Sequence, residues 1–208
     1  MKKNLFLDCD GVLYPQSKVL LKAVFGALKE ISIKDILTIT SKTSSFFKKD
    51  GFWNFFQYVL NGLGEEKIRR IFDATSNRID YNLIKPEEEI FRAIRKAQTN
   101  GWTVSIVTNG CKKHVDETLK SLWGINLEQA KEINISCFDI IDLRDNGRFY
   151  PKSKGGLQLL CKRTGAQPQN CLLIDDSKNA CREAEKMGIP ACNVTSSEVA
   201  KKIVEHCC

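Results

Sequence analysis

Polar residues follow three hydrophobic segments, each of which is typical of a buried strand. They are Asp8 and Asp10 after segment 4–7, Thr108 and Asn109 after segment 102–107, and Asp175 and Asp176 after segment 171–174. Open parallel sheets bind ligands at the carboxyl ends of their strands, so we expect these side chains at one edge of a sheet. Clustered carboxylates repel one another unless a cation compensates them, and Mg²⁺ is the hard cation that best fits oxygen ligands and a phosphate. The pattern therefore predicts a Mg²⁺ site.

Each group taken alone has a simpler explanation. Asp8 could cap a helix or form a turn, and Asp175 with Asp176 could cap the helix that follows. The segment 108–110 could be an ordinary turn. The run at 8–15, which reads DCDGVLYP directly after a hydrophobic strand, is much more specific. The three groups in this order favour a shared site.

The elements that must position these residues alternate between strands and helices. We expect strands at 4–7, 102–107, 140–141, 171–174 and 189–194, with helices from Pro86, after Gly110, at about 153–164, around 180–187 and from Thr195. Such alternation through short loops predicts an α/β fold, a Rossmann-like, doubly wound parallel sheet.

The pattern changes between the first strand and the second. Residues 15–83 carry helical patterns and an aromatic cluster at 46–58, without clear strand alternation. We predict a helical cap at 15–83 inserted into a catalytic core formed by 1–14 and 84–208. Trp53, Phe56 or Tyr58 could stack on the base of a nucleotide, although such aromatic clusters more often form the core of a small helical bundle.

Charge and hydropathy exclude some classes of protein. The formal net charge of the 208 residues is +7, but the basic residues are scattered, so a nucleic-acid-binding arm is not indicated. A mildly positive field would still attract an anionic small molecule. No run of 18 apolar residues is present, and Asp8 interrupts the short apolar start. We expect a cytoplasmic monomer or homodimer that binds neither nucleic acid nor membrane.

The nine cysteines do not form a disulfide pattern. Their number is odd, no CxxC pair occurs, and most of them lie in apolar segments where a free thiol behaves as a small hydrophobe. We expect reduced thiols. The terminal His206-Cys207-Cys208 could bind a metal or carry a lipid, although a frayed tail is the simpler interpretation.

Across essentially the whole chain, these motifs resemble those of the haloacid dehalogenase superfamily of hydrolases. The resemblance implies that Asp8 is a nucleophile that attacks phosphorus and binds Mg²⁺. Asp10 would protonate the leaving oxygen, activate water later, and offer its backbone carbonyl to the metal. Dehalogenases of the superfamily lack this second aspartate, so a phosphatase acting through an aspartyl-phosphate is implied.

The resemblance also implies roles for the later motifs. Thr108 and the amides of Asn109 and Gly110 would hold phosphoryl oxygens. Asp176 would be the principal acidic metal ligand, with Asp175 assisting directly or through water.

Two features depart from the family pattern. The family's lysine could be Lys152 or Lys154, and the segment reads Pro-Lys where relatives often have Lys-Pro. The usual helix length before the strand that leads to Asp176 favours Lys152. Ala180 stands where many relatives have another acid. We expect Asp175 to substitute for it, because many of those relatives have glycine at that point.

The stretches 10–17, 108–114 and 174–179 look most similar to the pyrimidine 5′-nucleotidase-like branch. The implied substrate is a small phosphorylated metabolite of the nucleoside 5′-monophosphate class. A sugar-phosphate phosphatase or a phosphomutase would share every core motif, and a non-enzymatic binding protein on the same fold stays a more distant alternative.

Overall fold

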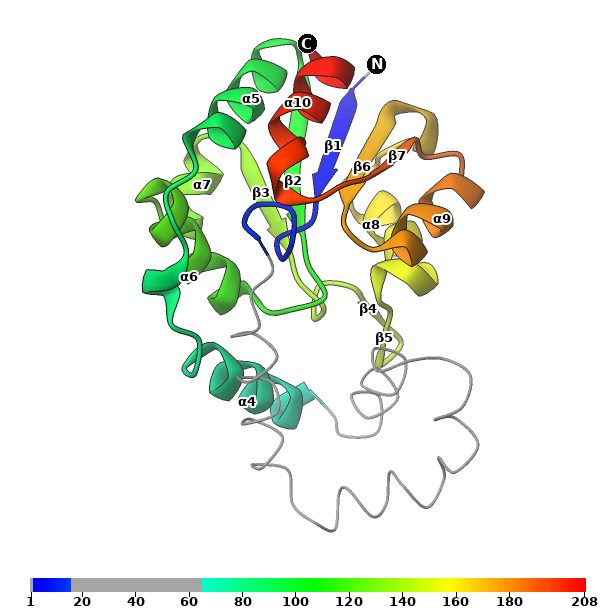
Figure 1. The fold of residues 1–208 in the computed structure, drawn as a ribbon. Coiled ribbons are helices and arrows are strands. Elements are labelled where there is room, and N and C mark those ends of the chain that lie inside the picture. Colours follow the sequence, from blue (N-terminus) through cyan, green and yellow to red (C-terminus); the bar gives the residue numbers. More distant parts are fainter. Residues whose placement is uncertain (1, 16–64) are drawn as a thin grey trace.

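The centre of the computed structural model, which describes residues 2–15 and 65–208, is a five-stranded sheet in the order β3-β2-β1-β6-β7 (Figure 1). Every neighbouring pair of strands is parallel. The strands are β1 (Lys3–Leu7), β2 (Trp102–Val107), β3 (Ile135–Phe138), β6 (Cys171–Asp175) and β7 (Ala191–Asn193). The chain moves outward from β1 in one direction and then resumes on its other side, so the switch point lies between β1 and β6.

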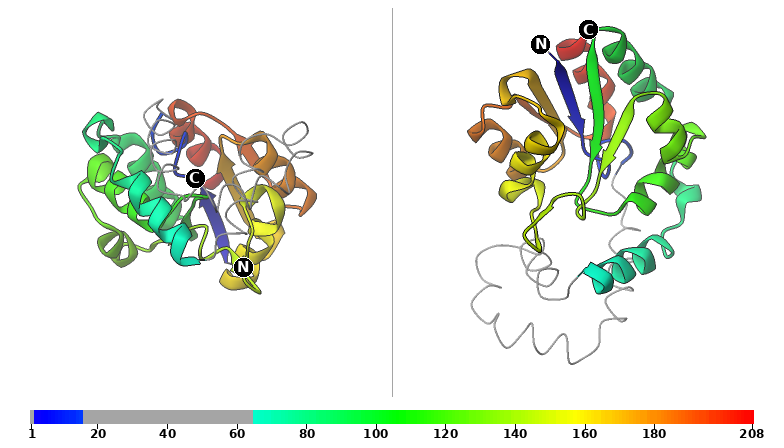
Figure 2. Two further views of the ribbon diagram at one scale, coloured as in Figure 1. Left: turned by 90° about the horizontal axis from the view of Figure 1, so that it is seen from below. Right: turned by 180° about the vertical axis from the view of Figure 1, so that it is seen from behind.

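Helices cover both faces of this sheet, as the two views in Figure 2 show. One face carries α5 (Glu88–Thr99), α6 (Lys112–Trp123), α7 (Leu127–Glu132) and α10 (Ser196–Cys207). The other face carries α8 (Leu157–Thr164) and α9 (Lys178–Lys186). The predicted α/β fold with a doubly wound parallel sheet is confirmed.

The two faces of the sheet follow from the alternation of side chains along each strand. Leu5 and Leu7 are fully buried against the face that carries α5, α6, α7 and α10. Phe6, between them, is fully buried against α8 and α9. Burial on both faces explains why β1 is a continuous hydrophobic run.

Helix α4 (Glu65–Ser76) lies beyond the carboxyl edge of the sheet (Figure 1). Its residues Ile68 and Phe72 pack with Cys111, Ile140 and Phe149 in a third hydrophobic cluster. A short 3₁₀ turn, η1 (Tyr81–Leu83), connects α4 to α5. Of the predicted cap, the segment 16–64 with its aromatic residues lies outside the described residues, so the cap stays a prediction.

Two element boundaries predicted from the sequence are wrong. The third strand is Ile135–Phe138 rather than 140–141, because the Asp139 carboxylate accepts bonds from the backbone N–H groups of Ile141 and Asp142, both at 3.0 Å, and turns the chain. The helix expected at 153–164 begins only at Leu157.

Three smaller elements were not expected. They are α7, the 3₁₀ turn η3 (Pro168–Asn170) and an antiparallel hairpin of β4 (Arg144–Asp145) with β5 (Arg148–Phe149). The hairpin turn contains Asn146 at φ 48° and Gly147 at φ 79°, which is the Asn-Gly signal of a tight hairpin. Among the described residues, no helix is both long and apolar enough to cross a membrane.

Candidate active site

Asp8 and Asp175 lie side by side at the switch point of the sheet. The N–H of Asp8 bonds to the carbonyl of Ile174 at 3.0 Å, which extends the β1–β6 ladder by one residue. Lys152 Nζ lies 2.5 Å from Asp8 Oδ1, 2.7 Å from Asp175 Oδ2 and 3.0 Å from the carbonyl oxygen of Val107. One buried ammonium group therefore joins β1, β2 and β6 at their carboxyl ends.

The chain bends sharply to bring Lys152 into this position. The segment Lys152–Gly156 forms a wide turn before α8, and Gly155 within it has φ 84°. The N–H of Lys152 also bonds to Asn109 Oδ1 at 3.1 Å. Of the two candidate lysines, the structure brings Lys152 into the cluster, with 1% of its surface exposed, and leaves Lys154 exposed.

The charges of the cluster are not balanced by this lysine alone. Burial raises the pKa of Asp8 well above its usual range; Lys152 opposes this shift, while Asp175 and Asp10 add to it. Burial works against the charge of Lys152, but Asp175 and Asp8 raise its pKa above the usual value. The ammonium group therefore stays charged, and burial together with the neighbouring carboxylates outweighs its effect on the pKa of Asp8.

Asp8, Asp175 and Asp176 each offer a carboxylate oxygen, and these oxygens all lie within 4.8 Å of one another. Burial, and then the neighbouring Asp175, raise the pKa of Asp176. Gly11 makes room for this carboxylate, since a Cβ at Gly11 would lie 2.2 Å from Asp176 Oδ2. Three clustered carboxylates with a single lysine are a hard-oxygen donor set that fits Mg²⁺.

The loop after β2 also reaches the site. The N–H of Thr108 bonds to the carbonyl of Phe138 at 3.0 Å, and 1% of Thr108 is exposed. The Gly110 N–H bonds to Thr108 Oγ1 at 2.9 Å, so the amide expected to hold phosphate is bonded within its own loop. Asn109 uses its side-chain oxygen to hold the backbone of Lys152. The loop thus positions the lysine as well as Thr108.

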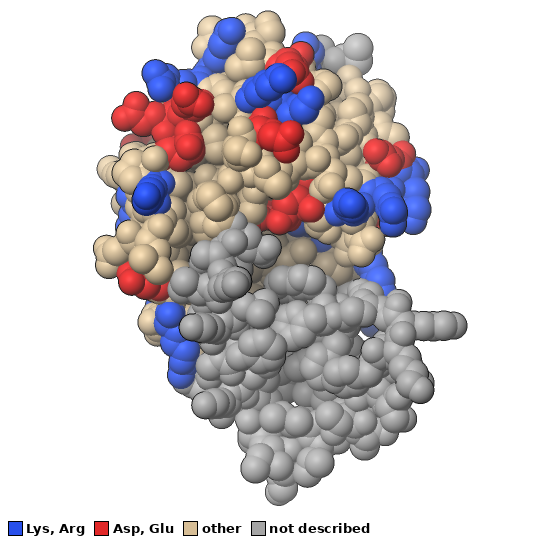
Figure 3. Space-filling model, in the orientation of Figure 1, with Lys and Arg blue, Asp and Glu red and all other residues tan. Residues whose placement is uncertain are grey.

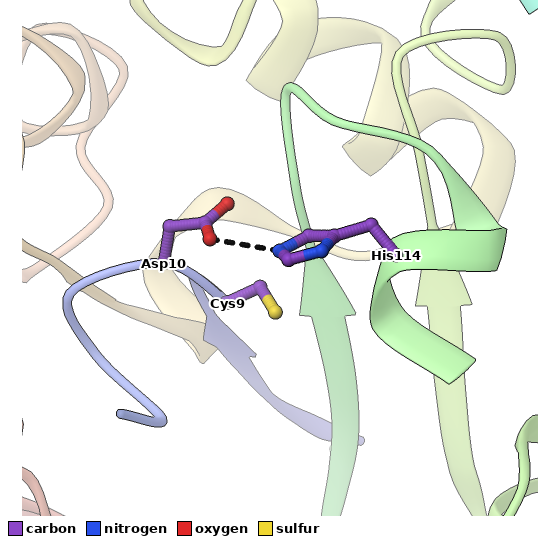
Figure 4. Close-up of side chains that lie close together, drawn as sticks. All are labelled: Cys9, Asp10 and His114. Atoms are coloured by element: carbon purple, nitrogen blue, oxygen red, sulfur yellow. Dashed lines mark hydrogen bonds and ion pairs between the residues drawn. The ribbon is translucent and has the colours of Figure 1, made fainter. Parts of the chain in front are cut away.

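Asp10 lies beside this cluster and has partners that the sequence did not reveal. Its Oδ1 accepts a hydrogen bond from the Tyr14 hydroxyl and lies 2.9 Å from His114 Nε2 (Figure 4). His114 Nδ1 lies 2.9 Å from the Tyr81 hydroxyl. Burial would raise the pKa of Asp10, but His114 and Tyr14 together lower it below its usual value.

A signal for this network was present in the sequence. His114 is one of only two histidines in the chain, and it follows the Thr108 loop closely. That His114 is only 4% exposed and lies in the first turn of α6 could be seen only in the structure.

On the face shown in Figure 3, basic and acidic side chains are interspersed rather than gathered into a basic stripe. The nine cysteines are all free thiols in the structure, and Cys208 is the exposed one.

The parallel sheet thus carries three clustered carboxylates and a buried lysine at its switch point. The family model described as haloacid dehalogenase-like hydrolase matches residues 5–194. The chain therefore belongs to this family, and the resemblance inferred from the sequence is confirmed. A search of curated proteins finds no match to the chain.

Several solved structures share this fold at low identity. The CbbY protein of Rhodobacter sphaeroides, in complex with phosphate, superposes with a TM-score of 0.56 at 15% identity over 92% of this chain and 85% of CbbY. A mutant of the same protein, in complex with xylulose-(1,5)bisphosphate, gives a TM-score of 0.56 at 14% identity over the same shares of the two chains. The enzyme bt-2542 of Bacteroides thetaiotaomicron, in complex with magnesium and inorganic phosphate, gives 0.53 at 15% identity over 95% and 96% of the two chains. The family and these bound groups agree with the predicted phosphatase class and Mg²⁺ cofactor.

Proposed function

We propose that this chain is a Mg²⁺-dependent phosphomonoester hydrolase that acts through an aspartyl-phosphate at Asp8. The observation that carries the proposal is the contact of one buried lysine, Lys152, with both Asp8 and Asp175 at the switch point of the sheet. A cation beside the nucleophile offsets the repulsion between an anionic carboxylate and an anionic phosphate. It also binds phosphoryl oxygens as they gain charge.

The reaction runs in two displacement steps. An Asp8 carboxylate oxygen attacks phosphorus, a new O–P bond forms, and the bond from phosphorus to the ester oxygen breaks. A bound phosphate dianion beside Asp10 raises the pKa of this carboxyl, so that Asp10 takes up a proton. Asp10 then gives that proton to the departing oxygen, and an alcohol leaves. Asp10 then takes a proton from water, whose oxygen attacks phosphorus, and inorganic phosphate leaves Asp8. Splitting a very slow hydrolysis through a covalent intermediate makes two easier steps.

The remaining residues bind and orient the phosphate. Lys152 and the Thr108 loop line the edge where the phosphoryl oxygens would lie. Asp8 and Asp176, with Asp175 and the backbone carbonyl of Asp10 nearby, would hold Mg²⁺. When bound, the ion supplies Lewis-acid stabilisation of the phosphoryl group.

Nucleoside 5′-monophosphates such as UMP and CMP are the proposed substrates. Support comes from the stretches 10–17, 108–114 and 174–179, which look most similar to pyrimidine 5′-nucleotidases. A sugar phosphate is the second candidate, because CbbY was solved with xylulose-(1,5)bisphosphate. We further propose a cytoplasmic enzyme that works as a monomer or homodimer.

The test is phosphate release from a panel of nucleoside and sugar phosphates, with Mg²⁺ and with EDTA. Asp8→Asn should abolish turnover, and the wild type should gain the mass of one phosphoryl group when quenched during turnover. Asp73→Asn, an exposed aspartate on α4, is the matched control and should turn over normally. Turnover by Asp8→Asn at the wild-type rate would refute the mechanism. The ranking of UMP and CMP against sugar phosphates decides the substrate class.

A further inference from the structure

A hydrogen-bonded chain of side chains, in which Tyr14 and His114 are buried, holds one oxygen of the Asp10 carboxylate. Tyr14 and His114 Nε2 both contact Oδ1, and no described residue bonds to Oδ2. The His114 ring is held in turn by the Tyr81 hydroxyl at Nδ1. In Figure 4 the Asp10 carboxylate points toward the His114 ring, across the gap between the β1 loop and α6.

We infer that His114 is a positioning residue, which holds the Asp10 carboxylate so that Oδ2 faces the leaving oxygen of the substrate. The inference rests on the proposed phosphatase function and adds to it a residue outside the motifs that carry the family's chemistry. The last side-chain torsion angle of aspartate has a broad, roughly two-fold distribution, so the carboxylate rotates easily. Two partners at Oδ1 restrict that rotation and leave Oδ2 to exchange a proton with the substrate.

Tyr14, His114 and Tyr81, the three residues that hold Asp10 directly or through His114, come from separate parts of the chain. Tyr14 lies four residues after Asp10, in the same loop, so by itself it cannot fix that loop relative to the sheet. His114 comes from the first turn of α6, and Tyr81 comes from η1, the turn after α4. With Asp10 ionised, Nε2–H donates to Oδ1, and in a neutral ring Nδ1 accepts from the Tyr81 hydroxyl. Tyr81 thereby orients the ring, as a partner of the second ring nitrogen does in other sites.

A metal site is the alternative for the same residues. Ligand atoms of Cys9, Asp10 and His114 lie within 4.8 Å of one another. The 2.9 Å separation of His114 Nε2 from Asp10 Oδ1 is that of a direct hydrogen bond, which favours positioning over metal binding. Stoichiometric zinc in the purified wild type, lost in Cys9→Ala and in His114→Ala, would overturn the positioning role.

The test compares two substrates that differ in their need for a proton. An alkyl phosphate expels a basic alkoxide unless Asp10 protonates it, whereas p-nitrophenyl phosphate expels a stable anion. The value of kcat/KM reports the steps up to loss of the leaving group. His114→Ala should lower kcat/KM for the alkyl phosphate by about 10–100-fold, a part of the ~10²–10⁴-fold supplied by a positioned acid. It should lower kcat/KM for p-nitrophenyl phosphate by less than about 3-fold, since that step gains little from an acid.

Further variants separate positioning from a general structural role. His114→Gln places an amide donor where Nε2–H was, and it should restore most of the lost activity toward the alkyl phosphate. Tyr81→Phe should give a smaller loss with the same substrate preference, and it tests the inference even if His114→Ala fails to fold. Thr118→Val alters a buried side chain one turn further along α6 and should leave kcat/KM unchanged for both substrates.

Each remaining outcome has a definite meaning. If folded His114→Ala or Tyr81→Phe loses kcat/KM equally for both substrates, or for neither, the positioning role is overturned and the proposed function stands. Absence of Mg²⁺-dependent turnover by wild type of both esters and of the whole panel of nucleoside and sugar phosphates would refute the proposed function, and the positioning role would fall with it.

Discussion

Replacing Lys152 with methionine removes the only described cation in contact with both Asp8 and Asp175, and it conserves most of the side-chain volume. Lys152 Nζ bonds to two carboxylates at 2.5 and 2.7 Å and to the Val107 carbonyl, with 1% of the residue exposed. Removing one partner of a buried ion pair typically costs about 3–5 kcal/mol, because the other charge stays buried and unpaired. We therefore expect Lys152→Met to lower the free energy of unfolding by about 3–5 kcal/mol in EDTA.

The loss should depend on pH in a defined direction. Without the lysine, nothing opposes burial and the repulsion from Asp175 and Asp10, which raise the pKa of Asp8 above its value of about 3.9 in the unfolded chain. The folded variant then binds more protons than the unfolded chain at neutral pH, so its stability falls as pH rises through the folded pKa. The stability deficit of Lys152→Met should accordingly be larger at pH 8 than at pH 5.

Urea unfolding followed by circular dichroism measures both quantities. Lys154→Met is the matched control: its side chain is exposed, and the change should stay within about 0.5 kcal/mol of wild type. The double variant Lys152→Met with Asp175→Asn should recover part of the loss, because a buried charge is removed with its partner. A deficit below about 1 kcal/mol for Lys152→Met, or an equal deficit for Lys154→Met, would refute the reasoning.

Three other expectations follow from individual contacts. Gly11→Ala should weaken Mg²⁺ activation, because the new Cβ would displace Asp176 Oδ2; the measurement is a higher Mg²⁺ concentration at half-maximal rate. Gly124→Ala is the control, since Gly124 also has a positive φ but no atom lies within 4 Å of the new Cβ, and this variant should lose stability only. Asp139→Ala should cost about 2–4 kcal/mol in urea unfolding, since it leaves the backbone N–H groups of Lys112, Ile141 and Asp142 without their acceptor. Cys208 should react with Ellman's reagent before the other eight thiols of the native protein, and a Cys208→Ser variant that keeps the fast phase would contradict this.

Most of the fold could be predicted because the sheet is buried on both faces. Such strands are continuous hydrophobic runs that end abruptly at polar residues, which is how β1, β2 and β6 were found. The edge strand β3 was missed because Asp139, rather than a glycine or proline, ends it. Its carboxylate accepts bonds from backbone N–H groups within the turn and at the start of α6, and nothing in the local sequence distinguishes this role from that of a surface acid.

The candidate site could be predicted only as far as local motifs reach. Asp8, Asp10, Thr108 and Asp176 occupy strand ends, and strand ends of a parallel sheet share an edge. The contact of Asp10 with His114, and that of His114 with Tyr81, connect separate segments through side chains, and no spacing rule predicts them. The choice between Lys152 and Lys154 also depended on a wide turn with a glycine at positive φ, which shifted the start of α8.

We expect Asp175 to compensate for the alanine at position 180. Ala180 is buried on α9 and offers no ligand. Both oxygens of Asp175 are engaged, Oδ1 by the Ser177 N–H at 2.8 Å and Oδ2 by Lys152 at 2.7 Å. Asp175 therefore contributes mainly by holding the lysine and by adding negative charge beside Asp176, whose carboxylate faces Gly11. We expect the negative charge that attracts a divalent cation to come from Asp8 and from the consecutive Asp175 and Asp176, which the ends of β1 and β6 bring together.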